Sequence, residues 1–428
     1  MRHLAKQRKG RTISGILLGK FVAGVLACTL LFFPMPFSAS AETRERFSIH
    51  AVPAFSDIPV TGVIWESPEP TLPTALSGTS AQSALLMNAN TGEILFRQND
   101  SARLPMASTT KIMTALVAVE SLPLDTPVTV TEEAVGVEGS SIYLTEGETL
   151  TLEALLYALM MESANDAAVA IAVAVSGSVE AFAEKMNQRA ASLGLTDTHF
   201  TNPHGLDHAE HYTTARELAL IAREALKHET LVSIMSTQRK TIPHEGTGGV
   251  RLMLNHNKLL RTYEGAIGVK TGFTKKSGRC LVSAARRGEV TLIAVTIKAS
   301  NDWRDHTAML DYGFSLYDTV ELCPEGAFEA PLWVVGGTGE YVMVKNHQTL
   351  VMALPKDHGD IRCVVELPRF VYAPIASGDE VGRLVYYESA PDGSWHYLGE
   401  VPLYAQHGVQ AEVYKKSLLD KISELFGF

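Results

Sequence analysis

The hydrophobic positions change their spacing several times along the chain, and each change marks a predicted element. Short apolar runs at residues 84–87 and 93–96 flank the turn-forming residues 90–92, which predicts a β-hairpin. Beyond Pro105, the apolar residues between 112 and 119 recur at helical spacing. Further helices are predicted at residues 151–159, 167–175, 179–193, 214–227 and 302–317, and strands at 266–271, 279–286 and 290–298.

These elements divide the chain into regions of different period. Helices between early and late strands predict an α/β domain at residues 81–320, whose sheet joins both ends of the region. Residues 321–406 are short alternating segments separated by glycine and proline, which predicts a small all-β domain. In residues 409–428 apolar side chains return to helical spacing on one face, which predicts an amphipathic helical tail. Such a tail either contacts a membrane surface, as we expect, or packs on its own domain.

The N-terminus has the three-part layout of a secretory signal peptide. A basic stretch ending at Arg11 precedes the apolar residues 13–33, and Ala39-Ser40-Ala41 has the form of a cleavage site. We expect residues 1–41 to be removed, with an uncleaved anchor as the alternative, and the working site to lie outside the cytoplasmic membrane. The proline-rich residues 42–80 are predicted to form a flexible spacer.

Charge and cysteine usage narrow the range of partners. Residues 1–41 hold six basic side chains and no acid, so the rest of the chain carries −16 where the whole chain carries −10. An acidic body argues against a nucleic-acid partner. Loss of Cys28 with the signal leaves Cys280, Cys323 and Cys363, so at most one disulfide can form within the mature chain. We favour structural cysteines in a core.

The first candidate for chemistry is Ser108-Thr109-Thr110-Lys111. Residues three apart share a helix face, so the Lys111 amine would lie within reach of the Ser108 hydroxyl. A serine becomes a nucleophile when a base takes its proton, and a lysine kept neutral by burial or by a neighbouring cation can be that base. The pattern alone is weak, because about one or two matches occur by chance in a chain of this length. The alternative is a helix cap followed by a solvated lysine.

Two further triplets carry suitable groups. Ser163-Ala164-Asn165 falls between two predicted helices, where the hydroxyl could relay a proton and the amide could hold a peptide carbonyl. Lys270-Thr271-Gly272 ends a predicted strand and offers a cation and a hydroxyl to a carboxylate, followed by a glycine that lets substrate approach the backbone. Taken singly, each triplet is also an ordinary turn.

Four histidines lie close together in the sequence, at positions 199, 204, 208 and 211. Such a group can indicate a metal site. There is no H-E-x-x-H pattern, however, and we favour a structural or cleft-lining loop. We therefore expect neither a metal nor a cofactor.

The order S-x-x-K, S-x-N, K-T-G resembles the motif set of the penicillin-binding protein and serine β-lactamase superfamily. The closer resemblance is to the low-molecular-mass D-alanyl-D-alanine carboxypeptidases, and it covers about residues 83–322. It rests on residues 83–93, 106–107, 202–207, 211–215 and 265–278, with residues 373–403 similar to the family's C-terminal domain. The resemblance implies a β-lactamase/transpeptidase-like domain, with an antiparallel sheet and a helical cluster, followed by a small all-β domain.

The same resemblance implies a reaction and a set of roles. Ser108 would attack the carbonyl of the penultimate D-alanine of a peptidoglycan stem peptide, Lys111 would accept its proton, and Ser163 would shuttle a proton. The implied substrate-binding residues are Asn165, Lys270, Thr271, Gly272, Phe273 and Arg304. The backbone N–H groups of Ser108 and Phe273 would form an oxyanion hole. Arg304 is the candidate for the substrate carboxylate, with Arg286 or Arg287 as alternatives, and β-lactams would be covalent inhibitors.

The same motifs and scaffold are compatible with three other functions. A serine β-lactamase shares the fold, but no E-x-x-L-N pattern lies between Asn165 and Lys270. A D,D-endopeptidase would use the same site as a carboxypeptidase. A non-catalytic wall-binding protein on the same scaffold is the alternative from a different class.

Overall fold

The computed structural model describes residues 49–51, 60–65, 75–244 and 248–413. Contacts divide the chain into two units. The larger unit comprises residues 68–320 and 352–358, and the smaller comprises residues 1–67, 321–351 and 359–428. The larger unit carries all the candidate site residues.

A five-stranded antiparallel sheet with the order β4-β3-β11-β10-β9 forms the centre of the larger unit. Its strands are β3 (Ala81–Asn88), β4 (Ile94–Gln98), β9 (Ala266–Thr274), β10 (Gly278–Arg287) and β11 (Val290–Ala299). The predicted hairpin and the three predicted late strands are all present. Because β3 pairs with β11, strands from the two ends of the region share one sheet, as expected.

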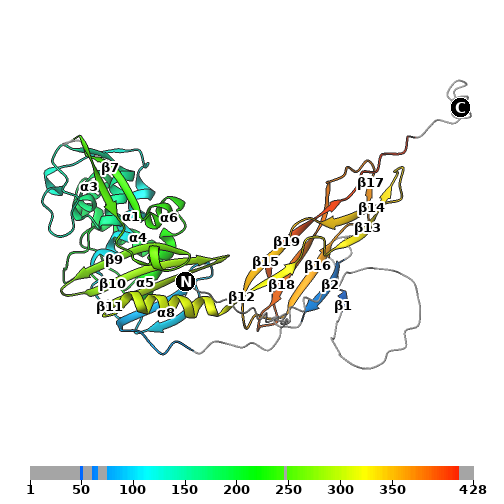
Figure 1. The fold of residues 1–428 in the computed structure, drawn as a ribbon, viewed down its shortest axis with the longest axis horizontal. Coiled ribbons are helices and arrows are strands. Elements are labelled where there is room, and N and C mark those ends of the chain that lie inside the picture. The colour runs from blue at the N-terminus through cyan, green and yellow to red at the C-terminus, as the bar shows by residue number, and fades with distance from the viewer. Residues whose placement is uncertain (1–48, 52–59, 66–74, 245–247, 414–428) are drawn as a thin grey trace, which may run out of the picture. The chain divides into compact units, whose positions relative to one another are not determined.

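Helices cover both faces of this sheet. Neighbouring residues of a strand point to opposite faces, and here both sets are apolar, so each face needs helices packed against it. The helices are α1 (Lys111–Ser121), α2 (Leu152–Tyr157), α3 (Asn165–Ser176), α4 (Val179–Ser192), α5 (Ala215–Ala225), α6 (Glu229–Ser236), α7 (Leu259–Thr262) and α8 (Asp302–Ser315). Ile293 and Val295 of β11 join the large core of α1, α3, α4 and α5, whereas Leu292 and Ala294 join the smaller core beneath α8. Figure 1 shows α8 along one side of the sheet and α1, α3 and α4 on the other.

Short elements complete the larger unit. The helical turns are η1 (Ala107–Thr110), η2 (Glu132–Ala134) and the π-helical η3 (Ala158–Glu162). Two small antiparallel hairpins are β5 (Pro127–Thr129) with β6 (Thr149–Thr151), and β7 (Arg239–His244) with β8 (Gly249–Leu254). These hairpins are absent from the sequence prediction.

The smaller unit contains an eight-stranded sheet with the order β1-β2-β16-β18-β19-β14-β13-β17. Its strands are β1 (Ile49–Ala51), β2 (Val60–Trp65), β13 (Glu329–Val335), β14 (Tyr341–Asn346), β16 (Ile361–Glu366), β17 (Phe370–Tyr372), β18 (Glu380–Ser389) and β19 (Trp395–Ala405). Outside that sheet, β12 (Tyr317–Cys323) and β15 (Leu350–Pro355) pair in a two-stranded sheet, and each of these strands has residues assigned to both units. The predicted all-β region is therefore correct in type.

The flexible spacer predicted at residues 42–80 is wrong for part of its length. Residues 60–65 form β2, which pairs with β16 in register from Val60–Glu366 to Trp65–Ile361, and β1 pairs with β2. Its prolines suggested a spacer, but the edge of β16 offers hydrogen bonds that a short run such as Val63-Ile64-Trp65 can complete. The segment belongs to the C-terminal sheet although it precedes the larger unit in the sequence.

The helical tail predicted at residues 409–428 is also wrong at its start. Val409 exchanges both backbone hydrogen bonds with Ile375, and the Glu412 N–H donates to the Gly336 carbonyl. These residues are extended because bonds from the neighbouring chain satisfy their backbone groups. Residues 414–428, like the predicted signal peptide, lie outside the described residues. Among the described residues, no single helix is long and apolar enough to cross a membrane, and only the bent pair α3–α4 passes that test jointly.

Candidate active site

Ser108 lies on a tight turn at the start of a buried helix. The residues of η1 continue directly into α1, so Ser108 and Lys111 stand one turn apart, as their spacing predicted. Ala107 has a φ of 47°, which is uncommon for a residue other than glycine. Strain of this kind persists where the surroundings hold it, and it gathers at functional sites. Ser108 is only partly buried and remains reachable.

Lys111 points from the first turn of α1 into this site and is fully buried. Its Nζ lies 3.0 Å from the Ser108 Oγ, 2.7 Å from the Asn165 Oδ1 and 2.6 Å from the His204 carbonyl oxygen. Two of these partners are oxygens that can only accept. A neutral amine has two N–H groups and one lone pair, so donation to Asn165 and His204 leaves the lone pair facing the Ser108 hydroxyl.

The surroundings of Lys111 favour that neutral form. Burial and the nearby charge of Lys270 lower the pKa of the Lys111 amine well below its ordinary value of 10.5. Burial disfavours the charged form because the interior solvates an ammonium poorly, and a second cation repels it. The amine is thus a base in contact with a hydroxyl, the arrangement that activates a serine.

Ser163 and Asn165 occupy the predicted break between two helices. The π-helical turn η3 ends at Glu162, Ser163 adopts the left-handed conformation with φ 61° and ψ 30°, and α3 begins at Asn165. Both side chains are buried. The Asn165 Nδ2 donates to the Glu138 carbonyl at 2.5 Å, which fixes its Oδ1 toward Lys111. The side-chain amide therefore orients the lysine.

Strand β9 brings the third triplet alongside the serine. Lys270 pairs with Val282, whose side chain belongs to the core beneath α1, so Lys270 faces that same side. At Gly272, an added Cβ would lie 3.1 Å from the amide nitrogens of Ser108 and Thr109. The strand can approach the serine turn this closely because residue 272 has no side chain.

Lys270 is as deeply buried as Lys111, and its Nζ donates to the Thr271 carbonyl oxygen at 3.0 Å. Burial lowers the pKa of Lys270 to about 7, and the negative charge of Glu162 opposes that shift. Three parts of the chain therefore supply the amines and hydroxyls of the site. Strand β9 supplies Lys270, the continuous η1–α1 segment supplies Ser108 and Lys111, and the η3–α3 junction supplies Ser163.

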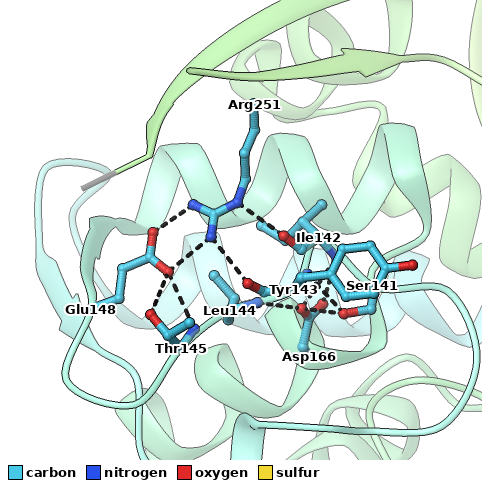
Figure 2. Close-up of polar contacts among 8 residues, drawn as sticks. All are labelled: Ser141, Ile142, Tyr143, Leu144, Thr145, Glu148, Asp166 and Arg251. Atoms are coloured by element: carbon cyan, nitrogen blue, oxygen red, sulfur yellow. Dashed lines mark hydrogen bonds and ion pairs between the residues drawn. The ribbon is translucent and has the colours of Figure 1, made fainter. Parts of the chain in front are cut away.

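A loop at residues 138–148 supports this site, and Figure 2 shows how it is fastened. The Asp166 carboxylate, next to Asn165, accepts hydrogen bonds from the backbone of Ile142 and Leu144 and from the Ser141 hydroxyl. From β8, the Arg251 guanidinium donates to the Ile142 and Tyr143 carbonyls. The loop in turn supplies the Glu138 carbonyl to Asn165.

The same guanidinium forms a buried ion pair with Glu148 at 2.5 Å. Burial raises the pKa of the Glu148 carboxyl, but the hydrogen bonds from Arg251 and from the Thr145 backbone outweigh burial and leave the pKa below its ordinary value. Glu148 is therefore ionised at neutral pH, and the pair closes the loop against β8 (Figure 2).

The remaining predicted residues are more exposed than the two lysines. Thr271 and Gly272 are partly buried, whereas the Phe273 side chain is 65% exposed. Arg304 is exposed in the first turn of α8, next to Asp302. Asp302 pairs at 2.9 Å with Arg279, which lies opposite Phe273 in the sheet. Arg304 is thus at the same end of the sheet as Phe273, whereas Arg286 and Arg287 lie at the other end of β10.

The histidine-rich loop bonds mainly to its own backbone and to the serine turn. His199 contacts the Glu210 carbonyl, and His211 lies between Thr201 and Thr110. Within the part of the chain that the structure describes, no three His, Cys, Asp or Glu side chains are grouped to hold a metal. Cys280, Cys323 and Cys363 are all buried, and no disulfide joins any two of them.

Several residues of the site escape motif reasoning. The His204 carbonyl, the Glu138 carbonyl and the Asp166 carboxylate act through hydrogen bonds between segments far apart in the sequence. A backbone carbonyl leaves no trace in the residue type. Gly205 is a position where the residue type does carry a signal, because a glycine can mark a place where two backbone segments approach closely. A Cβ at Gly205 would lie only 2.0 Å from the Ala107 oxygen.

The sequence of this chain matches a known protein family and several of its members. The family model described as D-alanyl-D-alanine carboxypeptidase, peptidase S11, matches residues 70–301. A protein named D-alanyl-D-alanine carboxypeptidase DacF from Bacillus subtilis is 35% identical over 315 residues, which is 71% of this chain and 81% of that protein. DacD from Escherichia coli is 31% identical over 76% of this chain and 82% of that protein.

Solved structures give the same result. The carboxypeptidase DacD from Francisella tularensis has a TM-score of 0.56 at 26% identity, covering 81% of this chain and 97% of that one. Penicillin-binding protein 5 from Haemophilus influenzae has a TM-score of 0.56 at 28% identity, covering 79% of this chain and 100% of that one. The predicted fold class and the family resemblance are confirmed. The chain belongs to the D-alanyl-D-alanine carboxypeptidase family of serine peptidases.

Proposed function

We propose that this chain removes the terminal D-alanine from peptidoglycan stem peptides through an acyl-enzyme on Ser108. The observation that carries the proposal is the contact of a buried amine of lowered pKa, Lys111, with the Ser108 hydroxyl at 3.0 Å. Family membership supplies the substrate class, since the relatives are named for D-alanyl-D-alanine. The Lys111–Ser108 contact identifies the attacking group, and family membership identifies the bond that is cleaved.

The reaction proceeds in two steps. The Ser108 Oγ attacks the carbonyl carbon of the penultimate D-alanine while its proton passes to the Lys111 Nζ. The peptide C–N bond then breaks, the leaving amine receives a proton, and free D-alanine departs. Water next attacks the Ser108 ester while Lys111 accepts its proton. The ester C–O bond then breaks, Lys111 returns the proton to the Ser108 Oγ, and the shortened peptide leaves with a new carboxylate.

The other motif residues position the substrate and its charge. Ser163 relays the proton toward the leaving amine, and the free N–H of the Asn165 amide holds the peptide backbone. Burial lowers the pKa of Lys111, and Lys270 in its protonated form lowers that pKa further by repulsion. Thr271 and Arg304 meet the terminal carboxylate, and the N–H groups of Ser108 and Phe273 receive the oxyanion beside Gly272.

β-Lactams would acylate Ser108 in the same way, because their strained amide meets the same nucleophile. A β-lactamase would require rapid hydrolysis of that ester. D,D-endopeptidase activity on cross-links is the finer alternative at this site, and a non-catalytic wall-binding protein would leave Ser108 unacylated. Action on peptidoglycan would take place outside the cytoplasmic membrane, and the apolar side chains among residues 414–428 would hold the enzyme near the membrane surface.

The test uses purified residues 42–428, which retain β1 and β2, with a synthetic peptide ending in D-Ala-D-Ala. We expect release of one free D-alanine per peptide, and its loss in Ser108→Ala. Lack of release by the wild-type enzyme would contradict the carboxypeptidase proposal. Cleavage of a cross-linked dimer with no attack on the linear peptide would favour the endopeptidase.

A further inference from the structure

A chain of buried hydrogen bonds runs from His211 to the peptide bond that precedes Ser108. The His211 ring is 3% exposed, and its Nε2 lies 2.8 Å from the Thr110 Oγ1. The Thr110 hydroxyl donates to the Ala107 carbonyl oxygen at 2.8 Å. Thr110 occupies one of the two middle positions of the S-x-x-K motif, whose residue type the motif does not specify, and neither His211 nor Ala107 belongs to one of the three motifs.

The direction of each hydrogen bond is fixed by its partners. The backbone N–H of Thr201 donates to the His211 Nδ1 at 3.1 Å, so this nitrogen carries no proton. The ring is neutral, because burial lowers the pKa of His211 to about 3. The proton is therefore on Nε2, whose N–H donates to the Thr110 Oγ1, and the Thr110 O–H donates in turn to the Ala107 oxygen.

The Ala107 carbonyl belongs to the same rigid plane as the Ser108 N–H. A peptide unit is planar, and in the trans form its C=O and N–H point in opposite directions. Holding the Ala107 oxygen therefore also fixes the direction of the Ser108 N–H. This N–H is on the side of β9, since an added Cβ at Gly272 would lie 3.1 Å from the Ser108 nitrogen.

From these observations we infer that His211 and Thr110 are positioning residues, which fix the Ala107–Ser108 peptide plane so that the Ser108 N–H points at the substrate oxyanion. The inference rests on the proposed function, because it assigns a purpose to the oxyanion hole of that reaction. Polarisation adds to orientation: a carbonyl that accepts a hydrogen bond makes the N–H of its own peptide unit a stronger donor.

Gly205 packs against the same carbonyl group. It has a φ of 89°, and a Cβ there would lie 2.0 Å from the Ala107 oxygen and 2.9 Å from the Thr110 Oγ1. The backbone of the histidine-rich loop thus packs directly on the carbonyl that Thr110 holds. With Ala107 at a φ of 47°, the peptide plane needs such support to keep its orientation.

The experiment compares Thr110→Val with Thr110→Ser in the mature protein. Valine keeps the shape of threonine but cannot donate to the Ala107 oxygen, whereas serine retains the hydroxyl. We expect Thr110→Val to lower the rate of acylation by penicillin on the order of tenfold, with little change in the non-covalent dissociation constant, and Thr110→Ser to restore most of the rate.

A spectroscopic readout separates this role from simple destabilisation. The ester carbonyl stretch of the acyl-enzyme, measured by infrared difference spectroscopy, moves to higher wavenumber when the oxyanion hole donates more weakly. We expect this shift in Thr110→Val and its absence in Thr110→Ser. For His211, glutamine can supply the lost Nε2 donor and asparagine cannot, so His211→Asn should show the larger shift.

The matched control is a second buried histidine–threonine pair on the other face of the sheet. His306 Nε2 lies 2.9 Å from the Thr296 Oγ1, and burial likewise lowers the pKa of His306 to about 3. Thr296→Val removes the same kind of bond at a similar cost in stability, and should change neither the carbonyl frequency nor the acylation rate. A wild-type frequency and rate in Thr110→Val would overturn the inference while leaving the proposed function intact. Failure of the wild-type enzyme to acylate would refute the proposed function instead.

Discussion

At the scale of single residues, burial sets the protonation of the two lysines. Lys111 and Lys270 are both withdrawn from water, and the pKa of each is lowered. The spacing of Ser108 and Lys111 predicted their contact, because a helix brings residues three apart together. That Lys270 lies close enough to repel Lys111 could not be derived from spacing, because 159 positions separate them and only the sheet unites them.

The lowered pKa of Lys270 predicts a dependence of stability on pH. Between the folded pKa of about 7 and the ordinary 10.5, the unfolded chain holds this proton and the folded chain does not. Unfolding therefore takes up a proton, and the free energy of unfolding rises with pH across this window. Lys270→Met should remove up to about 1.4 kcal/mol per pH unit from that slope.

Urea unfolding at several pH values between 7 and 10 measures the slope. Lys298, an exposed lysine on β11, provides the matched substitution Lys298→Met, for which we expect no change in slope. Equal slopes in wild type and Lys270→Met would show that Lys270 ionises normally in the folded protein.

At the scale of elements, the sequence predicted the large pieces well and the small hairpins poorly. α1, α8 and the strands β9–β11 have long or clearly periodic apolar patterns. The hairpin β7–β8 is short, and its exposed positions include Val250, Leu252 and Leu254, so its pattern resembles neither a buried strand nor a loop. Its importance comes from Arg251, whose partner Glu148 lies 103 positions earlier.

The Arg251–Glu148 pair predicts a large cost when one partner is neutralised. Glu148→Gln leaves the buried guanidinium without its counter-charge, and we expect a loss of about 3–5 kcal/mol in the free energy of unfolding. The exposed pair Arg103–Asp197 provides the control, and Asp197→Asn should cost less than about 1 kcal/mol.

Denaturant unfolding of both variants measures the two losses in the free energy of unfolding. The rate of penicillin acylation measures the effect on the loop. Because the loop supplies the Glu138 carbonyl to Asn165, Glu148→Gln should also slow acylation. Similar losses of stability in Glu148→Gln and Asp197→Asn would mean that the buried pair does not fasten the loop.

At the scale of the whole molecule, the smaller unit draws its strands from both ends of the chain. β2 precedes the larger unit in the sequence but forms the partner of β16. Sequence reasoning missed this because the surrounding prolines indicate a spacer, and no local signal identifies a partner strand about 300 residues away.

This pairing predicts the effect of removing the N-terminal strands. Deletion of residues 42–67 exposes one edge of β16, so the amides of residues 361–366 should exchange with deuterium faster than in the protein comprising residues 42–428. Residues 278–287 of β10 serve as the internal control and should exchange at the same rate. Unchanged protection of residues 361–366 would show that β2 does not hold that edge.

The most direct test of the whole account identifies the atom that penicillin acylates. Purified protein comprising residues 42–428 is treated with penicillin, digested, and analysed by mass spectrometry for the peptide that carries the added mass. We predict a single adduct on Ser108, absent in Ser108→Ala and greatly slowed in Lys111→Met, which keeps the bulk of the side chain but has no base. An adduct on another residue, or full-rate labelling of Lys111→Met, would contradict the claim that a neutral lysine activates this serine.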